Sequence, residues 1–278
     1  MINLKSIYYI SKKEFADNIR NKWVILLTSI FIILSVVASV LGGGGTLGGM
    51  SETVTALLSI SSLLIPLVGI MLGYATISGE EEKGSLPILL SYPVRRVEVI
   101  LGKFFGLGSV IAVSVFLGFG LSGLVIAFTV SSSNWLAYLT FILLTILLGL
   151  VFLSLAICFS ALLKKRSTSL GAGIFIFFWG MIMGSIIFGI YYLATGVSPQ
   201  DLFSNISNLP AWFWASIFLS PMDMNQTSIL FAFGIKQTFG VKIIPPDFIN
   251  IYSLVGAQLL WMIIPLTLGY YFFKRRDI

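Results

Sequence analysis

Side chains suited to acid–base or nucleophilic chemistry are scarce in this 278-residue chain. The sequence has no histidine and one cysteine, Cys158, which lies inside an apolar run. This excludes disulfides, zinc sites of histidine and cysteine, histidine general bases and cysteine–histidine pairs. We therefore expect no catalytic residue and no cofactor held by this chain.

Two methionine pairs are the remaining candidates for metal ligands. Met181 and Met183 share one apolar run, and Met222 and Met224 share a later segment. Thioethers suit copper(I). Methionine more often fills gaps between helices, so packing is the favoured interpretation and no metal site is predicted.

Charged residues concentrate in the segment 78–103, between two long apolar runs. The group holds three consecutive acids and several bases: Glu80, Glu81, Glu82, Lys83, Arg95, Arg96 and Lys103. These charges could form a docking surface for another protein, or a solvated loop that only sets the topology. The residues alone leave both interpretations open.

Local signals in this segment predict a short helix. The acids at 80–82 continue the preceding helix, Gly84 permits a break, and Ser85 caps a new helix that runs through Leu90. Pro93 ends it, because the residue before a proline is disfavoured in the α-region. A short transverse helix between acidic and basic residues results.

The elements that must position these residues are membrane helices. Apolar residues make up 57% and charged residues 10% of the chain, and the mean hydropathy is +1.00. Soluble domains contain roughly 45–50% apolar and about 25% charged residues. Uncharged runs long enough to cross a bilayer as helices indicate an all-α fold with six spans in one domain. These runs are 23–41, 54–77, 104–130, 135–163, 168–195 and 251–273.

The basic residues indicate the orientation. Fifteen of the seventeen lysines and arginines lie in the segment 1–22, in 78–103, in 164–166 or in 274–276, and only Lys236 and Lys242 lie in the alternate connections. By the positive-inside rule both termini are cytoplasmic and the chain is a multi-pass plasma-membrane protein. The net charge of +6 then needs no nucleic acid partner.

The segment 196–250 is predicted to be an exterior loop. Residues 212–233 are apolar enough for a seventh span, but they include proline and polar residues and would export the basic tail. We expect exterior structure with Trp212 and Trp214 at the headgroups. Asn205 and Asn225 lie in glycosylation sequons, which suit an outward-facing loop.

Two further patterns concern packing and lipid contact. Residues 4–19 place apolar side chains on one helical face and charges on the other, which predicts an interfacial helix that touches lipid and could also touch a cytoplasmic partner. Small residues at helical spacing form two ridges: Ser114, Gly118 and Ser122, and Gly180 with Gly184. They permit close packing, within one subunit or, as the less favoured alternative, between two copies.

The segment 78–103 resembles the membrane subunits of type-2 class ABC exporters. The resemblance rests on residues in this order: Glu80 to Glu82, Gly84-Ser85-Leu86, Leu89-Leu90-Ser91, Pro93, Arg95 or Arg96, and Gly102-Lys103. Ser220-Pro221-Met222-Asp223 stands where relatives often have Asn-Pro-Val/Leu-Asp, with Ser220 replacing the asparagine. The chain is most similar to the compact permeases of the nitrous-oxide reductase maturation group.

The resemblance implies a non-enzymatic subunit energised by another chain. It implies that 78–103 docks into an ABC ATPase, that two ATPase copies and a second copy of this chain complete the assembly, and that the ATPase holds ATP and magnesium. It also implies export.

The sequence leaves two alternative functions open. One is an ion-coupled carrier, weakened because no charged residue lies within the predicted spans, although Gln258 could coordinate a cation. The other is a membrane anchor or assembly platform for an enzyme complex.

A P-loop is absent, since Val97 stands where its first glycine should be and Phe104 follows Gly102-Lys103. The uncharged spans favour a lipidic, amphipathic or neutral cargo.

Overall fold

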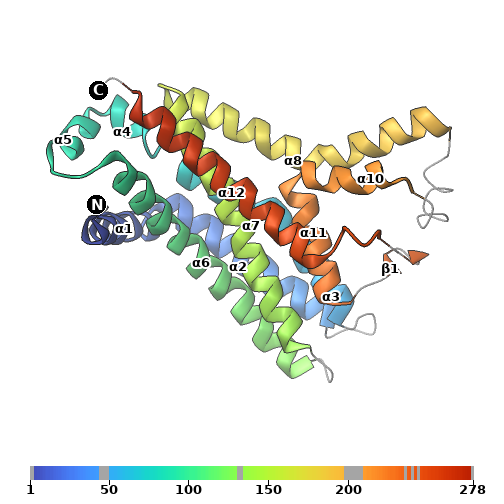
Figure 1. Ribbon diagram of the computed structural model, residues 1–278. Helices are drawn as coiled ribbons and strands as arrows, with labels where there is room; N and C mark the ends of the chain where they lie inside the picture. The colour runs from blue at the N-terminus through green and yellow to red at the C-terminus, as the bar shows by residue number, and fades with distance from the viewer. Residues whose placement is uncertain are drawn as a thin grey trace.

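The chain folds into a bundle of long helices (Figure 1). The computed structural model describes residues 3–43, 50–129, 134–196, 209–234, 237–238, 241–242 and 245–276. The long helices are α2 (Lys22–Gly43), α3 (Met50–Gly73), α6 (Arg96–Thr129), α7 (Trp135–Leu162), α8 (Arg166–Thr195) and α12 (Ile251–Lys274). The all-α prediction is confirmed apart from two-residue strands β1 (Gln237–Thr238) and β2 (Val241–Lys242), which pair antiparallel.

Five helical stretches in the described residues are long and apolar enough to cross a membrane. They are Val54–Glu82, Arg96–Leu124, Trp135–Leu162, Arg166–Thr195 and Ile251–Lys274. The run predicted at 23–41 corresponds to α2, which counts as a sixth crossing only together with α1 (Leu4–Ile19), the two being bent by 70° at their junction.

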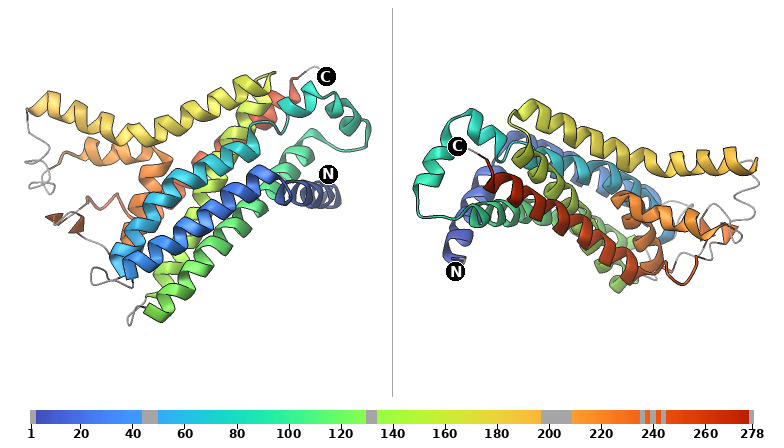
Figure 2. Two further views of the ribbon diagram at one scale, coloured as in Figure 1. Left: turned by 180° about the vertical axis from the view of Figure 1, so that it is seen from behind. Right: turned by 45° about the horizontal axis from the view of Figure 1, so that its top comes forward.

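Helix α7 is the centre of the bundle. It packs against α3, α6, α8, α11 (Pro221–Ala232) and α12. In α7, 78% of the most apolar 18-residue stretch is buried inside the subunit. The corresponding share is 22% in α8 and 17% in α12. Figures 1 and 2 show α8 diverging from the other long helices toward the end that carries α10 (Ala211–Ala215). The apolar faces of α8 and α12 are therefore open to lipid or to another chain.

Small residues allow the close approaches. A methyl group added at Gly69 of α3 would lie 2.8 Å from the carbonyl oxygen of Gly149 in α7. In α6, Gly118 accommodates the ring of Phe31 from α2, and the Ser114 hydroxyl lies 3.0 Å from that of Thr28. Ser122 donates to the carbonyl of Gly118 within α6. The structure thus places this predicted ridge inside the subunit.

The segment 212–233 is three short helices and not a span. These are α10, the 3₁₀ helix η2 (Ser216–Leu219) and α11, which starts where Pro221 occupies its first turn. Trp212 is exposed, but Trp214 is buried with Met224, so the expectation of Trp214 at the headgroups is wrong.

Of the two sequons, one lies within the description and the other does not. Asn225 is fully buried and donates to the carbonyl of Leu144 at 2.7 Å, so it is not open to glycosylation in the folded chain. Asn205 lies outside the described residues.

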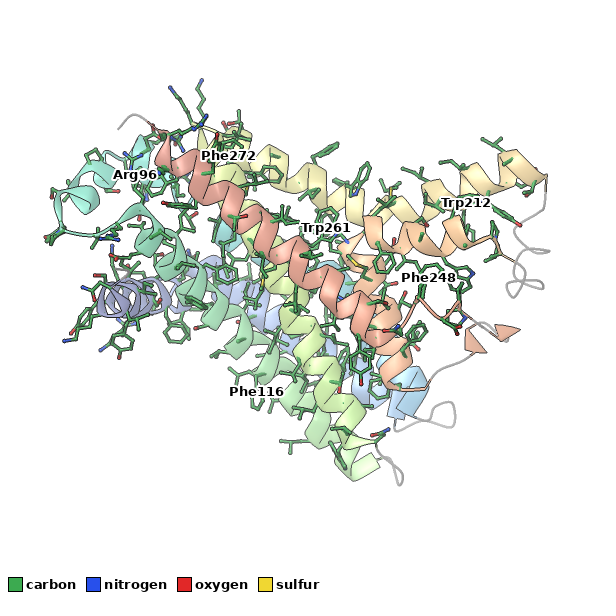
Figure 3. All side chains as sticks on the ribbon, viewed as in Figure 1. Arg96, Phe116, Trp212, Phe248, Trp261 and Phe272 are labelled. Carbon is green, nitrogen blue, oxygen red and sulfur yellow. The ribbon has the colours of Figure 1, made fainter. Side chains whose placement is uncertain are left out.

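One end of the bundle carries α1, α4 (Ser78–Glu82), α5 (Ser85–Ser91) and the last turn of α12 (Figure 2). We call it the charged end. Arg96 lies there, far from Trp212 on α10 (Figure 3).

Replacing Gly69 by valine should destabilise the fold. The new side chain meets the backbone of α7 and cannot be relieved by a rotamer change, which should cost about 1–3 kcal/mol. Gly120→Val is the control, since nothing lies within 4 Å of an added Cβ there. We expect a lower melting temperature in detergent for Gly69→Val alone; equal melting of both variants would contradict the packing described.

Candidate functional site

A break in the chain separates the acids at 80–82 from the third helix. Helix α3 ends at Gly73 and α4 begins at Ser78. The hydroxyl of Ser160, on α7, accepts the backbone N–H groups of Ile77 and Ser78 at 3.0 and 3.1 Å. The acids therefore continue the preceding helix, as predicted, within the single stretch Val54–Glu82, but a short interruption held by a serine from α7 separates α4 from α3.

Helix α5 follows directly where the sequence predicts a short helix. Gly84 is its N-cap with φ +68°, a conformation that favours glycine. Ser85 is the first helical residue and not the cap; its hydroxyl donates to the carbonyl of Glu80 at 3.2 Å. The helix ends at Ser91 and the chain is extended at Tyr92, before Pro93.

Helix α5 is held by one side and presents the other outward. Leu86 is fully buried, whereas Ile88 and Tyr92 are 66% and 64% exposed. Pro87, Pro93 and Arg95 are also exposed. The side chains of Leu89 and Leu90 lie outside the description. An apolar tip thus projects from the charged end.

Lys103, itself buried, connects three helices through ion pairs to two partly buried carboxylates. Its ammonium lies 2.8 Å from a carboxylate oxygen of Glu14 on α1 and 2.7 Å from one of Glu80 on α4. The lysine, on α6, is 1% exposed. Two carboxylates compensate for its burial.

Arg276 forms a second connection, after the end of α12. Its guanidinium pairs with Glu81 on α4. It also donates to the carbonyls of Ser160, Ala161 and Leu163 at 3.0–3.1 Å. These are the carbonyls at the C-terminal end of α7, where a cation is favourable.

Arg96 and Glu82 complete the network. Arg96 donates to the carbonyls of Phe273, Lys274 and Arg276 at 2.6–2.9 Å, at the C-terminal end of α12. Glu82 accepts the backbone N–H of Arg166 at 2.9 Å, where α8 begins.

Most of the charges that sequence placed on a docking surface are therefore used inside the subunit. The outward-facing members are Lys83 and Arg95, with Glu82 partly engaged. Ion pairs connect α4 to α1, to α6 and to Arg276 after α12, and hydrogen bonds connect it to α7 and α8.

Neither methionine pair brings its own two thioethers together, although Met181 and Met222, one from each pair, line the same cavity. Met181 is exposed and Met183 buried on the same helix, while Met222 and Met224 belong to different buried clusters. In the described part of the chain no three His, Cys, Asp or Glu side chains gather to hold a metal ion.

The ridge on α8 packs against α11. The hydroxyl of Ser220 donates to the carbonyl of Gly180 at 3.0 Å, and a methyl group added at Gly184 would lie 3.5 Å from the Asp223 carboxylate. This part of the ridge is thus occupied within the subunit.

Sequence analysis missed three residues of the network. Glu14 is 89 positions from Lys103, and Ser160 and Arg276 are each more than 80 positions from their partners on α4. A lysine that directly precedes an apolar run, as Lys103 does, is a weak signal that a distant acid will pair with it. The sequence does not indicate which acid.

Known proteins resemble this chain along nearly all of it. Residues 8–278 match the family described as ABC-2 family transporter protein. Two curated proteins, each described as probable ABC transporter permease protein NosY, come from Stutzerimonas stutzeri and Pseudomonas aeruginosa. Each is 32% identical to this chain, over 98% of it and 99% of the relative.

Replacing Lys103 by methionine should destabilise the charged end. The change leaves the carboxylates of Glu14 and Glu80 without their cation. Breaking a fully buried pair costs about 3–5 kcal/mol, and we expect a smaller loss here because water still reaches both carboxylates. Lys83→Met, at an exposed site, is the control. Thermal unfolding in detergent is the measurement; a Lys103→Met protein that melts like the wild type would refute this role.

Proposed function

Since this chain belongs to the ABC-2 family of transporter proteins and is the membrane subunit of an ABC transporter, we propose that α4 and α5 couple it to a separate ATPase. The observation that carries the proposal is the combination of an exposed apolar tip on α5 with a buried ionic network behind it. The tip receives the ATPase and the network transmits its movement.

The orientation follows from the same end of the molecule. The charged end carries α1, α4, α5 and the connection between α7 and α8 (Figure 2), and fifteen of the seventeen basic residues lie in 1–22, 78–103, 164–166 and 274–276. The positive-inside rule places this end, with both chain termini, in the cytoplasm, where ATP is available. Helix α1 then lies along the inner membrane surface, with its lysines near anionic lipid.

Docking is proposed to rest on apolar contact and shape more than on the charges. Among the described residues of this tip, Ile88 and Tyr92 are large and exposed, and aromatic and aliphatic anchors dominate protein interfaces. Arg95 and Lys83 form a charged rim around them. The partly buried acids, Glu80 and Glu81, have a different part: they hold α4 against α1, α6, α7 and the end of α12.

The assembly is proposed to contain two copies of this chain and two ATPases, which hold ATP and magnesium. Helix α8 offers an open apolar face for the second copy, because only 22% of its most apolar 18-residue stretch is buried. Closure of the ATPases would then move the two subunits and open the pathway alternately to either side. The family resemblance gives export as the direction.

A charge placed at the tip should remove the ATPase. Ile88→Glu should reduce capture of the ATPase subunit from native membranes at least tenfold, because a carboxylate cannot enter an apolar contact. Ile88→Leu is the matched control and should capture normally. Equal capture by both variants, with unchanged melting temperatures, would sink the docking site.

A break in the network should uncouple the subunits without separating them. Glu81→Gln removes the charge that faces Arg276, so the ATPase should still be captured and still hydrolyse ATP. Its hydrolysis should no longer drive conformational change. ATP-dependent labelling of a cysteine at Ser185 in reconstituted complexes reports that change, with Asp17→Asn as the control at an exposed acid outside the network. Wild-type labelling in Glu81→Gln would count against transmission through α4.

A further inference from the structure

A cavity of about 540 Å³ lies between α3, α8 and α11. Cavities of roughly 300–1,000 Å³ are typical for small-molecule ligands. This one is remote from the charged end, since α8 reaches it about halfway along its length, at Gly180 and Gly184. The site therefore does not belong to the coupling elements.

A carboxylate in the wall sets the chemistry of this cavity. Asp223 is the third residue of α11, and its backbone N–H is accepted by the hydroxyl of Ser220, the N-cap. The N-terminus of the helix favours a negative charge there. In the described chain the side-chain ion pairs involve Lys103 and Arg276, so Asp223 has no cationic partner within it.

The residues around the carboxylate leave it accessible. Gly184 keeps α8 free of a side chain at the point where a methyl group would lie 3.5 Å from the Asp223 oxygen. Hydroxyls of Ser59 and Ser185 and the amide of Gln226 also line the space. Gln226 is fixed by a 3.1 Å hydrogen bond to Ser62.

The remaining wall is apolar. Leu63 on α3 and Phe188 and Met181 on α8 line it, and all three side chains are more than a third exposed. A ligand that satisfies this wall carries one positive charge with hydrogen-bond donors and an apolar body. A divalent metal ion ordinarily needs several anionic or oxygen ligands in a tight shell, and one carboxylate does not supply them.

We propose that this cavity binds a small organic monocation, an amine whose ammonium group pairs with Asp223 and whose apolar part contacts Leu63 and Phe188. This inference rests on the proposed function, because it names the class of cargo for the same subunit. It replaces the expectation of a neutral cargo, which came from uncharged spans; Asp223 lies outside all six predicted spans, in the segment between the last two.

The test is binding of n-hexylammonium to the purified full-length chain in lipid nanodiscs, measured by isothermal titration calorimetry. We expect saturable binding that weakens at least tenfold in Asp223→Asn and is unchanged in Asp247→Asn, an exposed acid. The isosteric alcohol n-hexanol and the anion hexanoate should bind at least tenfold more weakly than the amine.

A second variant keeps the test meaningful should Asp223→Asn unfold. Ser185→Phe fills the cavity without touching the cap of α11 and should also abolish binding. Three results would each overturn the proposal. The alcohol could bind as well as the amine, or the amine could still bind to both variants. Copper(I) could also bind in place of the amine, through Met181 and Met222. The binding test contains no ATPase, so its failure leaves the coupling proposal intact. Conversely, a wild-type chain that binds the amine but captures no ATPase would contradict only the coupling proposal.

Discussion

A buried lysine is tolerated only where carboxylates meet it, and Lys103 imposes this requirement on the whole charged end. Its two partners come from α1 and α4, so both helices must be seated before the charge is compensated. Arg276 repeats the requirement with Glu81 and the last carbonyls of α7. Together these pairs fix the position of α4, and hence of α5, relative to the bundle.

The same requirement explains what sequence could and could not predict. The long helices and the short helix at α5 follow from local signals: apolar runs of sufficient length, a glycine at 84 and a proline at 93. The break before α4 has no such signal, because the hydroxyl of Ser160 that holds it comes from another helix. Charges near the membrane were assigned to an outer surface, whereas long-range partners draw most of them inward.

The segment between α8 and α12 shows a similar limit of local reasoning. Its composition correctly argues against a seventh span, since proline and polar residues interrupt it. Which of its residues are buried depends on contacts with α7 and α12, and these bury Trp214 and Asn225. An aromatic residue or a sequon in a predicted loop therefore says little about exposure once the loop folds back on the bundle.

The packing of α1 against α6 has a consequence for biosynthesis. This helix packs on α6, where the Ser11 hydroxyl donates to the carbonyl of Gly102 and a methyl group added at Gly106 would lie 2.6 Å from the Ser11 carbonyl oxygen. Some ninety residues separate the two surfaces along the chain. Helix α1 is synthesised before α6 and therefore stays without its principal protein contact until α6 has been synthesised. During that interval an amphipathic helix can lie on a lipid surface.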